Sequence, residues 1–156
     1  MKIEGNKNVI FTPISELITN IFEHSGKSQG WVLAQIYPFQ NYVDVCIVDT
    51  GRGIKQCYEE ELSMKLNSHL EAFEMLANRE SSKSNKERGY GIYMSKKLIC
   101  KALNGNFVLL SGNAGWNIDA DFSNRAEIAD FYWHGVIASY RINFPNKQVD
   151  FYDFLE

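Results

Sequence analysis

One stretch of the chain, VDVCIVDTGRGI at residues 43–54, limits the possible folds more than any other. Apolar residues at every second position are typical of a largely buried β-strand. The strand ends in a carboxylate, Asp49, which is followed by the glycines Gly51 and Gly53. A buried carboxylate is unfavourable unless hydrogen-bond donors meet it, and glycines let another group approach the backbone closely. The stretch therefore indicates a ligand that donates to Asp49 and lies against the glycines. An ordinary strand-to-turn exit would use the same residue types.

The remaining patterns predict an α+β sandwich, with helices on one face of a mixed, mostly antiparallel sheet. Thr12 and Pro13 have the residue types of a helix N-cap and a first helical position, and Gly26 would end that helix. We expect strands at residues 31–37, 42–49, 106–112 and 135–144, helices at 59–79 and 92–103, a loop at 80–89, and a short strand with an irregular loop at 113–134.

Length and composition favour one domain over residues 1–156, with its core at about 12–145 and a short C-terminal tail. The formal net charge of -3 argues against a nucleic-acid partner, and no apolar run is long enough to span a membrane. The three cysteines form no CxxC pair, which favours free thiols in a reducing cytoplasm. The three histidines are scattered, without the spacing of a metal site.

A second motif is ELITNIFEHS, residues 16–25, in which Glu16 and Asn20 stand four residues apart. This spacing places both side chains on one face of a helix. A carboxylate there can polarise a water molecule, and an amide oxygen beside it can bind Mg²⁺. The alternative is a solvated polar helix face.

A third motif, RGYGI, brings Gly89 and Gly91 to a position just before a predicted helix. Backbone N–H groups and the positive end of the helix dipole can hold phosphate groups at such a position. The alternative is an ordinary helix start after a polar loop.

Taken together and in this order, the three motifs resemble those of the GHKL ATPase superfamily, which includes gyrase-type topoisomerases, heat-shock chaperones, sensor histidine kinases and mismatch-repair ATPases. ELITNIFEHS resembles the N box, DTGRGI the first glycine box and RGYGI the second, while GVIASYRINFP resembles the closing strand. The resemblance runs from about residue 12 to residue 145. It implies the Bergerat fold, a two-layer α/β sandwich that binds ATP and Mg²⁺ under a flexible lid.

The resemblance also implies a role for each matching residue. Asp49 would accept a hydrogen bond from the exocyclic amine of adenine, Asn20 would bind Mg²⁺, and Glu16 would be the general base. A carboxylate is a pure acceptor and would repel the O6 atom of guanine, so adenine is the expected base. The other residues expected to bind the nucleotide are Gly51, Gly53, Ile54, Lys83, Lys86, Arg88, Gly89, Tyr90 and Gly91.

The closing strand departs from the family pattern at one position. The family often has a threonine after the glycine of this strand, which helps to hold adenine through water. This chain has Val136 there, and Ser139 stands three residues further on. Whether Ser139 takes over that role stays open at this point.

Three functions are compatible with the motifs. The first is a kinase or ATPase module that binds ATP or ADP and acts in trans on a separate protein or phosphate acceptor, like the anti-sigma serine kinases. Glu16 and the EHS ending of the N box favour it, and residues 1–156 contain no phosphoacceptor histidine helix or transducer domain. The second is the catalytic domain of a histidine kinase, where asparagine is usual at the position of Glu16. The third is a non-enzymatic nucleotide-binding module.

Overall fold

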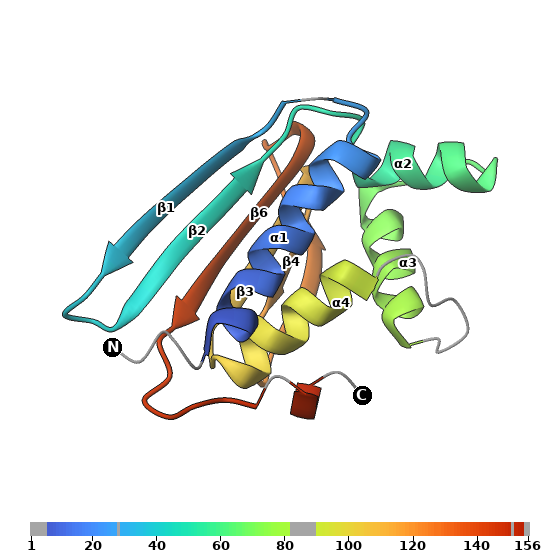
Figure 1. Cartoon of the computed structure of the whole chain (residues 1–156). Coiled ribbons are helices and arrows are strands. Elements are labelled where there is room, and N and C mark those ends of the chain that lie inside the picture. The colour runs from blue at the N-terminus through green and yellow to red at the C-terminus, as the bar shows by residue number, and fades with distance from the viewer. Residues whose placement is uncertain (1–5, 28, 82–89, 151, 155–156) are drawn as a thin grey trace.

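The computed structural model describes residues 6–27, 29–81, 90–150 and 152–154, which form a sheet covered on one face by helices (Figure 1). The strand order is β1-β2-β6-β3-β4-β5, and all pairings are antiparallel. The predicted α+β sandwich is confirmed, with an antiparallel sheet instead of a mixed one. The strands are β1 (Trp31–Tyr37), β2 (Tyr42–Val48), β3 (Asn106–Gly112), β4 (Ala114–Ile118), β5 (Ser123–Glu127) and β6 (Trp133–Asn143).

The helical layer consists of α1 (Lys7–His24), α2 (Gly53–Leu62), α3 (His69–Ser81), α4 (Tyr90–Lys96), the π-helical segment η2 (Lys97–Ala102) and the short η3 (Tyr152–Phe154). Helices α1 and α4 lie side by side across the sheet, while α2 and α3 lie toward one end of it (Figure 1). No helix among the described residues is both long enough and apolar enough to cross a membrane.

The predicted hairpin of β1 and β2 is confirmed. In β2 the side chains of Val43, Val45 and Ile47 are buried, while the intervening positions are partly exposed. This alternation identifies the odd-numbered positions of β2 as the face covered by helices, because successive side chains of a strand point to opposite faces. The core continues through the fully buried Trp116 and Tyr140.

The first helix begins at Lys7, so the predicted start at Thr12 and Pro13 is wrong and Pro13 lies inside α1. A proline inside a helix costs about 3 kcal/mol because it removes a hydrogen bond. The part of α1 that precedes the predicted start includes Val9 and Ile10, whose side chains are buried, with the residues 1% and 6% exposed. Burial of each such side chain contributes about 1.5–3 kcal/mol, which is enough to offset the proline.

The single helix expected at residues 59–79 is also wrong, since α2 and α3 are separate. The chain leaves α2 at Ser63, whose φ is +51°, in the left-handed region. Ser68 then caps α3 by accepting a hydrogen bond from the Glu71 N–H at 3.0 Å. The sequence SHLE at residues 68–71 is a helix-start signature of the S-x-x-E type, so the sequence did contain the signal.

The segment at residues 113–134 contains two strands, β4 and β5, instead of the expected short strand and irregular loop. Strand β5 (SNRAE) has no apolar alternation and is mostly exposed. Its position depends on pairing with β4 and on Arg125, which lies over the ring of Trp116 and forms an ion pair with Glu74. The helix expected at 92–103 is present as α4 and η2, and it ends before Asn104, whose φ is +47°.

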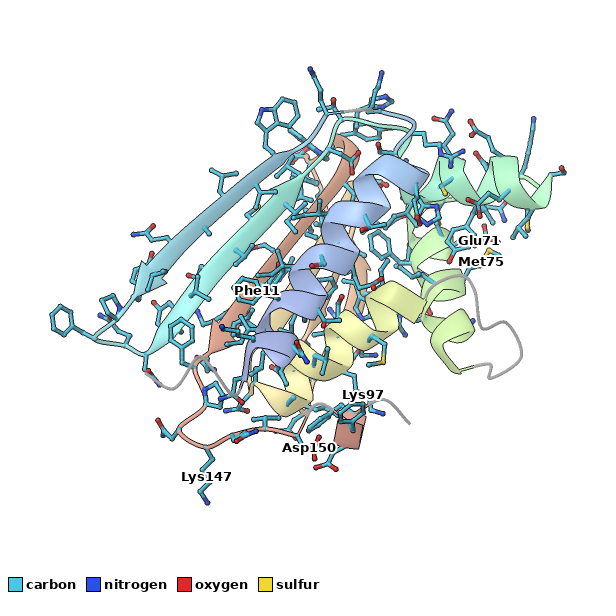
Figure 2. The ribbon with its side chains drawn as sticks, in the orientation of Figure 1. Phe11, Glu71, Met75, Lys97, Lys147 and Asp150 are labelled. Carbon is cyan, nitrogen blue, oxygen red and sulfur yellow. The ribbon has the colours of Figure 1, made fainter. Side chains whose placement is uncertain are left out.

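The segment after β6 returns to the start of α1. The side chain of Asn6 accepts a hydrogen bond from the Val149 N–H at 2.8 Å and donates one to the Lys147 carbonyl at 3.3 Å. Figure 2 shows Lys147 and Asp150 on the same side of the molecule as Lys97 of η2. Residues 147–149 are therefore fixed to the helical layer.

Candidate functional site

Asp49 lies directly after β2 and is 4% exposed. Its backbone N–H donates to the Val136 carbonyl at 2.9 Å, which extends the pairing of β2 with β6 by one residue. Its carboxylate oxygen Oδ1 accepts a hydrogen bond from the Gly51 N–H at 2.8 Å. Burial raises the pKa of the Asp49 carboxyl, and backbone hydrogen bonding by Gly51 and Val136 offsets part of that rise. No ion pair joins Asp49 to any residue that the structure describes.

The two glycines of the first glycine box are required by contacts within the chain. A Cβ atom at Gly51 would lie 2.1 Å from the Ser25 carbonyl oxygen, and the Arg52 N–H donates to that same oxygen at 2.9 Å. At Gly53 φ is +70°, and a Cβ would lie 2.8 Å from Ser111 Oγ. The glycines therefore let the end of α1 and strand β3 approach the loop after Asp49. Their contact with a ligand stays a prediction.

Ser111 is a residue of this region that the sequence analysis missed. Its hydroxyl donates to the Gly135 carbonyl at 2.7 Å and accepts from the Ile54 N–H at 3.0 Å. Ser111 is 1% exposed, so this hydroxyl joins β3, β6 and the start of α2 inside the protein. Its one signal in the sequence is a polar residue near the end of the apolar strand NFVLLSG.

The closing strand reaches Asp49 through Gly135. Here φ is +127°, and a Cβ would lie 2.3 Å from the Asp49 carbonyl oxygen, so a side chain has no room. The Trp133 indole N–H donates to that same oxygen at 2.9 Å. Val136 is next to Asp49, whereas Ser139 pairs with Cys46 and, three positions from Val136, lies on the opposite face of β6. Ser139 therefore does not replace the threonine of the family pattern.

Four further predicted site residues, Glu16, Asn20, Tyr90 and Gly91, lie on the helical layer. Glu16 is half-buried on α1, and Asn20 follows one turn later on the same helix. Tyr90 and Gly91 begin α4, which packs against α1. The side chains of Asn20 and Tyr90 lie outside the described part of the structure, as do Lys83, Lys86, Arg88 and Gly89. The roles given to these residues remain predictions.

Arg52, between the two glycines, holds the loop to both neighbouring helices. Its Nε donates to the His24 carbonyl at 2.6 Å, and its guanidinium forms an ion pair with Glu60. The hydrogen bond that Arg52 donates to the Glu60 carboxylate is the main reason that the pKa of Arg52 is raised. The Arg52 side chain thus makes its contacts within the chain, and its charge is paired with a carboxylate of α2.

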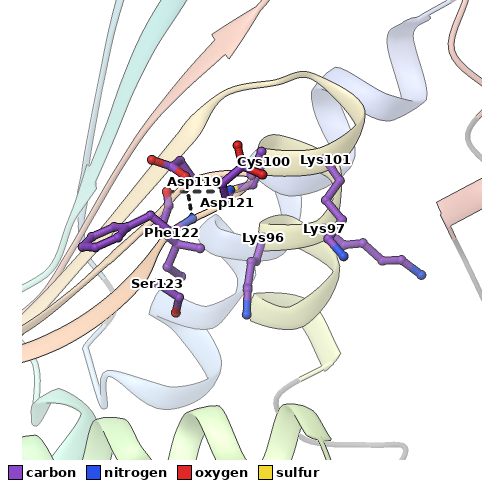
Figure 3. Close-up of a pocket in the computed structure, with 10 residues that line it drawn as sticks. Lys96, Lys97, Cys100, Lys101, Asp119, Asp121, Phe122 and Ser123 are labelled. Carbon is purple, nitrogen blue, oxygen red and sulfur yellow. Dashed lines mark hydrogen bonds between the residues drawn. The ribbon is translucent and has the colours of Figure 1, made fainter.

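A separate hollow of about 270 Å³ lies between η2 and the turn that joins β4 to β5 (Figure 3). Lys96, Lys97 and Lys101 line one side of it, and Asp119 folds the opposite turn by accepting backbone hydrogen bonds from Asp121 and Phe122. The Lys96 ammonium also lies 5.0 Å from the centre of the Trp116 ring. Because neither Asp49 nor the glycines of its loop line this hollow, it is distinct from the candidate site.

Comparison with known proteins identifies a family of ATP-binding proteins. The family model described as "Histidine kinase-, DNA gyrase B-, and HSP90-like ATPase" matches residues 5–126. The match includes Glu16, Asn20, Asp49 and both glycine boxes, and it ends before β6. No curated protein matches the chain.

Proposed function

Because the chain belongs to the histidine kinase-, DNA gyrase B- and HSP90-like ATPase family and is an ATP-binding module of the GHKL type, we propose that it uses Mg²⁺-ATP to act on a separate protein. The action is either transfer of the γ-phosphate to that protein or ATP hydrolysis that changes its state. The adenine would be held by Asp49, and Glu16 and Asn20 would serve the phosphate end.

The observation that carries this proposal is the surroundings of Asp49. Its carboxylate is buried, one of its oxygens accepts a backbone N–H, and no cation among the described residues neutralises it. An ionised carboxylate can accept about four hydrogen bonds, so acceptor capacity remains. The exocyclic amine of adenine is a donor that fits this capacity, whereas guanine presents a carbonyl oxygen at the same position.

The residues of α1 supply the chemistry in this proposal. Glu16 is half-buried and can take a proton from an attacking water or hydroxyl group. Asn20 offers an amide oxygen four residues away on the same helix, and oxygen ligands are those that Mg²⁺ prefers. When bound, Mg²⁺ would neutralise part of the phosphate charge. The family usually has asparagine in place of Glu16 in histidine kinases, which favours the kinase or ATPase module over that alternative.

The test has a binding arm and a chemical arm. In the binding arm, ATP, ADP and GTP are compared by calorimetry and by thermal shift, with Mg²⁺ present. ATP and ADP should raise the Tm because they bind the native state, and GTP should do so much less. Equal shifts with ATP and GTP would contradict the placement of adenine on Asp49.

In the chemical arm, the protein is incubated with ATP labelled at the γ-phosphate, alone and with proteins that co-purify with it. Label on a partner would identify a kinase, and released phosphate would identify an ATPase. Nucleotide binding without either product would mean that the third alternative, a binding module without catalysis, is correct.

A further inference from the structure

A group of metal-ligating side chains lies where the end of α1 meets α2. It consists of His24, the last residue of α1, and of Cys57 and Glu61 on α2, all of them half-buried. One ligand atom from each lies within 4.8 Å of the others. His24 Nδ1 is 3.6 Å from Glu61 Oε1, and Cys57 Sγ is 3.2 Å from that same oxygen. Glu61 Oε1 is therefore the central atom of the group.

We propose that His24, Cys57 and Glu61 bind one Zn²⁺ ion, with water as the fourth ligand. Imidazole nitrogen, thiolate sulfur and carboxylate oxygen are the three ligand types that Zn²⁺ takes in proteins, and tetrahedral sites with three protein ligands and a water are common. The charges also match, because one thiolate and one carboxylate together neutralise a divalent ion. These three ligands do not include Asn20, the residue assigned to Mg²⁺.

The fold brings these three ligands close together without a metal ion. Cys57 and Glu61 are four residues apart on α2, which puts them on one face of the helix. His24 is brought to that face by the loop after Asp49, since Arg52 binds the His24 carbonyl and the Arg52 N–H binds the Ser25 carbonyl. The sequence shows no sign of a site with histidine and cysteine ligands, because the three histidines are scattered and Cys57 follows His24 only after 33 positions.

Without metal, a hydrogen bond joins Cys57 to Glu61, and His24 lies beside the same carboxylate. The Cys57 thiol donates to Glu61, and burial together with that carboxylate raises the pKa of the thiol to about 11. Zinc binding would break the S–H bond, form a Zn–S bond and release the proton to solvent. The guanidinium of Arg52 is 3.8 Å from Glu61 Oε1, but its ion pair with Glu60 is shorter, so Arg52 keeps a partner when Glu61 turns to the metal.

The test uses Co²⁺ as a spectroscopic probe and then Zn²⁺, on the purified chain after treatment with a chelator and without nucleotide. A failure to bind nucleotide would thus not affect the result. We expect one equivalent of Co²⁺ to produce a sulfur-to-cobalt charge-transfer band and the visible bands of a tetrahedral site. One equivalent of Zn²⁺ should displace the cobalt and raise the Tm.

Cys57→Ser is the decisive variant, because it keeps the side-chain shape and removes the sulfur. It should abolish the charge-transfer band, while the matched control Cys46→Ser should keep it. His24→Ala and Glu61→Gln should weaken Zn²⁺ binding by at least roughly 10- to 100-fold. Loss of a residue that only supports a metal ligand already has an effect of this size. The Tm of each variant without metal shows whether it is folded.

Three results would overturn the proposal. The first is a wild-type protein that gives no cobalt–sulfur band, and the second is a band that survives in folded Cys57→Ser. The third is equal loss of the band in Cys46→Ser, which would place the metal on another thiol.

Discussion

Two aspartates of one strand region, Asp44 within β2 and Asp49 directly after it, have opposite surroundings. Asp44 forms an ion pair with Arg141 on the neighbouring strand, in which Arg141 Nε and Nη2 donate to the two carboxylate oxygens at 2.7 and 2.8 Å. The side chains of both partners are more than a third exposed. Asp49 is 4% exposed, and the structure's described residues bring no cation to it.

The difference follows from the positions of the two residues along the strand. They are five residues apart, so they lie on opposite faces of the sheet, with Asp49 toward the helices and Asp44 away from them. The ion pair with Arg141 offsets the partial burial of Asp44, so no ligand is needed to explain that carboxylate. Asp49 retains an unfavourable burial that nothing described in the chain offsets in full, and a ligand that donates to it would do so.

Glu16 extends the comparison to a third carboxylate, and its replacement should give the largest effect. Glu16→Gln keeps the shape of the side chain and removes the base, so turnover should fall by roughly 10²–10⁴-fold. ATP affinity should change little, because Glu16 is assigned to chemistry and Asp49 to binding. Steady-state phosphate release, together with calorimetric titration of ATP, measures both. Unchanged turnover in this variant would make Glu16 a structural residue.

Asp49→Asn should give the next largest effect. An amide would present a donor to the amine of adenine, and we expect ATP binding to weaken by about 2–4 kcal/mol, or roughly 30- to 900-fold in Kd. The matched control is Asp44→Asn, the same change five residues earlier within β2, which should leave ATP affinity as it is. If both variants weaken ATP binding equally, the distinction between the two aspartates is wrong.

Low pH should mimic Asp49→Asn in the wild-type protein. Burial raises the pKa of Asp49 above its ordinary value of 3.8, so protonation begins at a higher pH than for an exposed aspartate. ATP affinity should fall by about tenfold per pH unit once the pH is below this pKa. Stability should change in the opposite direction. Because the pKa of Asp49 is raised in the folded state, Asp49 contributes to the free energy of unfolding at acid pH, and this contribution is lost as the pH rises. Calorimetry across this pH range should show no such fall in Asp49→Asn.

Ser111→Ala tests the hydroxyl that supports the loop after Asp49. It would leave the Gly135 carbonyl and the Ile54 N–H without the partner they share. Loss of a buried hydrogen-bond partner costs about 1–3 kcal/mol of unfolding free energy. Chemical denaturation measures this value, and Ser139→Ala, on the other face of the sheet, is the control that should stay close to wild type.

The smallest effect should come from Asp44→Asn on stability. Ion pairs with this degree of exposure contribute about 0.2–1 kcal/mol, even when they have two hydrogen bonds. Denaturation at low and high salt should show a small loss that shrinks as salt rises. A loss of several kcal/mol would mean that Asp44 and Arg141 matter far more to the fold than their exposure suggests.

The parts of the fold that depend on local pattern could be predicted from the sequence. The β1–β2 hairpin and the burial of the strand before Asp49 follow from alternation alone. The start of α1 could not be predicted, because Val9 and Ile10 extend the helix only by packing against distant residues. Strand β5 has no pattern of its own and depends on β4.

The candidate site shows the same division. Asp49 was identified from its position at the end of an apolar strand, and the structure confirms its burial. Ser111 and the group of His24, Cys57 and Glu61 were not identified, because their roles depend on segments that meet only in the folded chain. The assignments of Glu16 and Asn20 depend on their spacing along one helix and on the family resemblance, and they remain predictions.

The contact between Gly51 and Ser25 has a consequence for how motion could pass through the protein. The loop after Asp49 and the end of α1 touch backbone to backbone, with no space for even a methyl group between them. A displacement of the end of α1 would therefore carry this loop with it instead of being absorbed by side chains. A partner protein that displaced α1 on binding would therefore also move the Asp49 carboxylate, the group assigned to adenine. Bound adenine would in turn oppose that displacement.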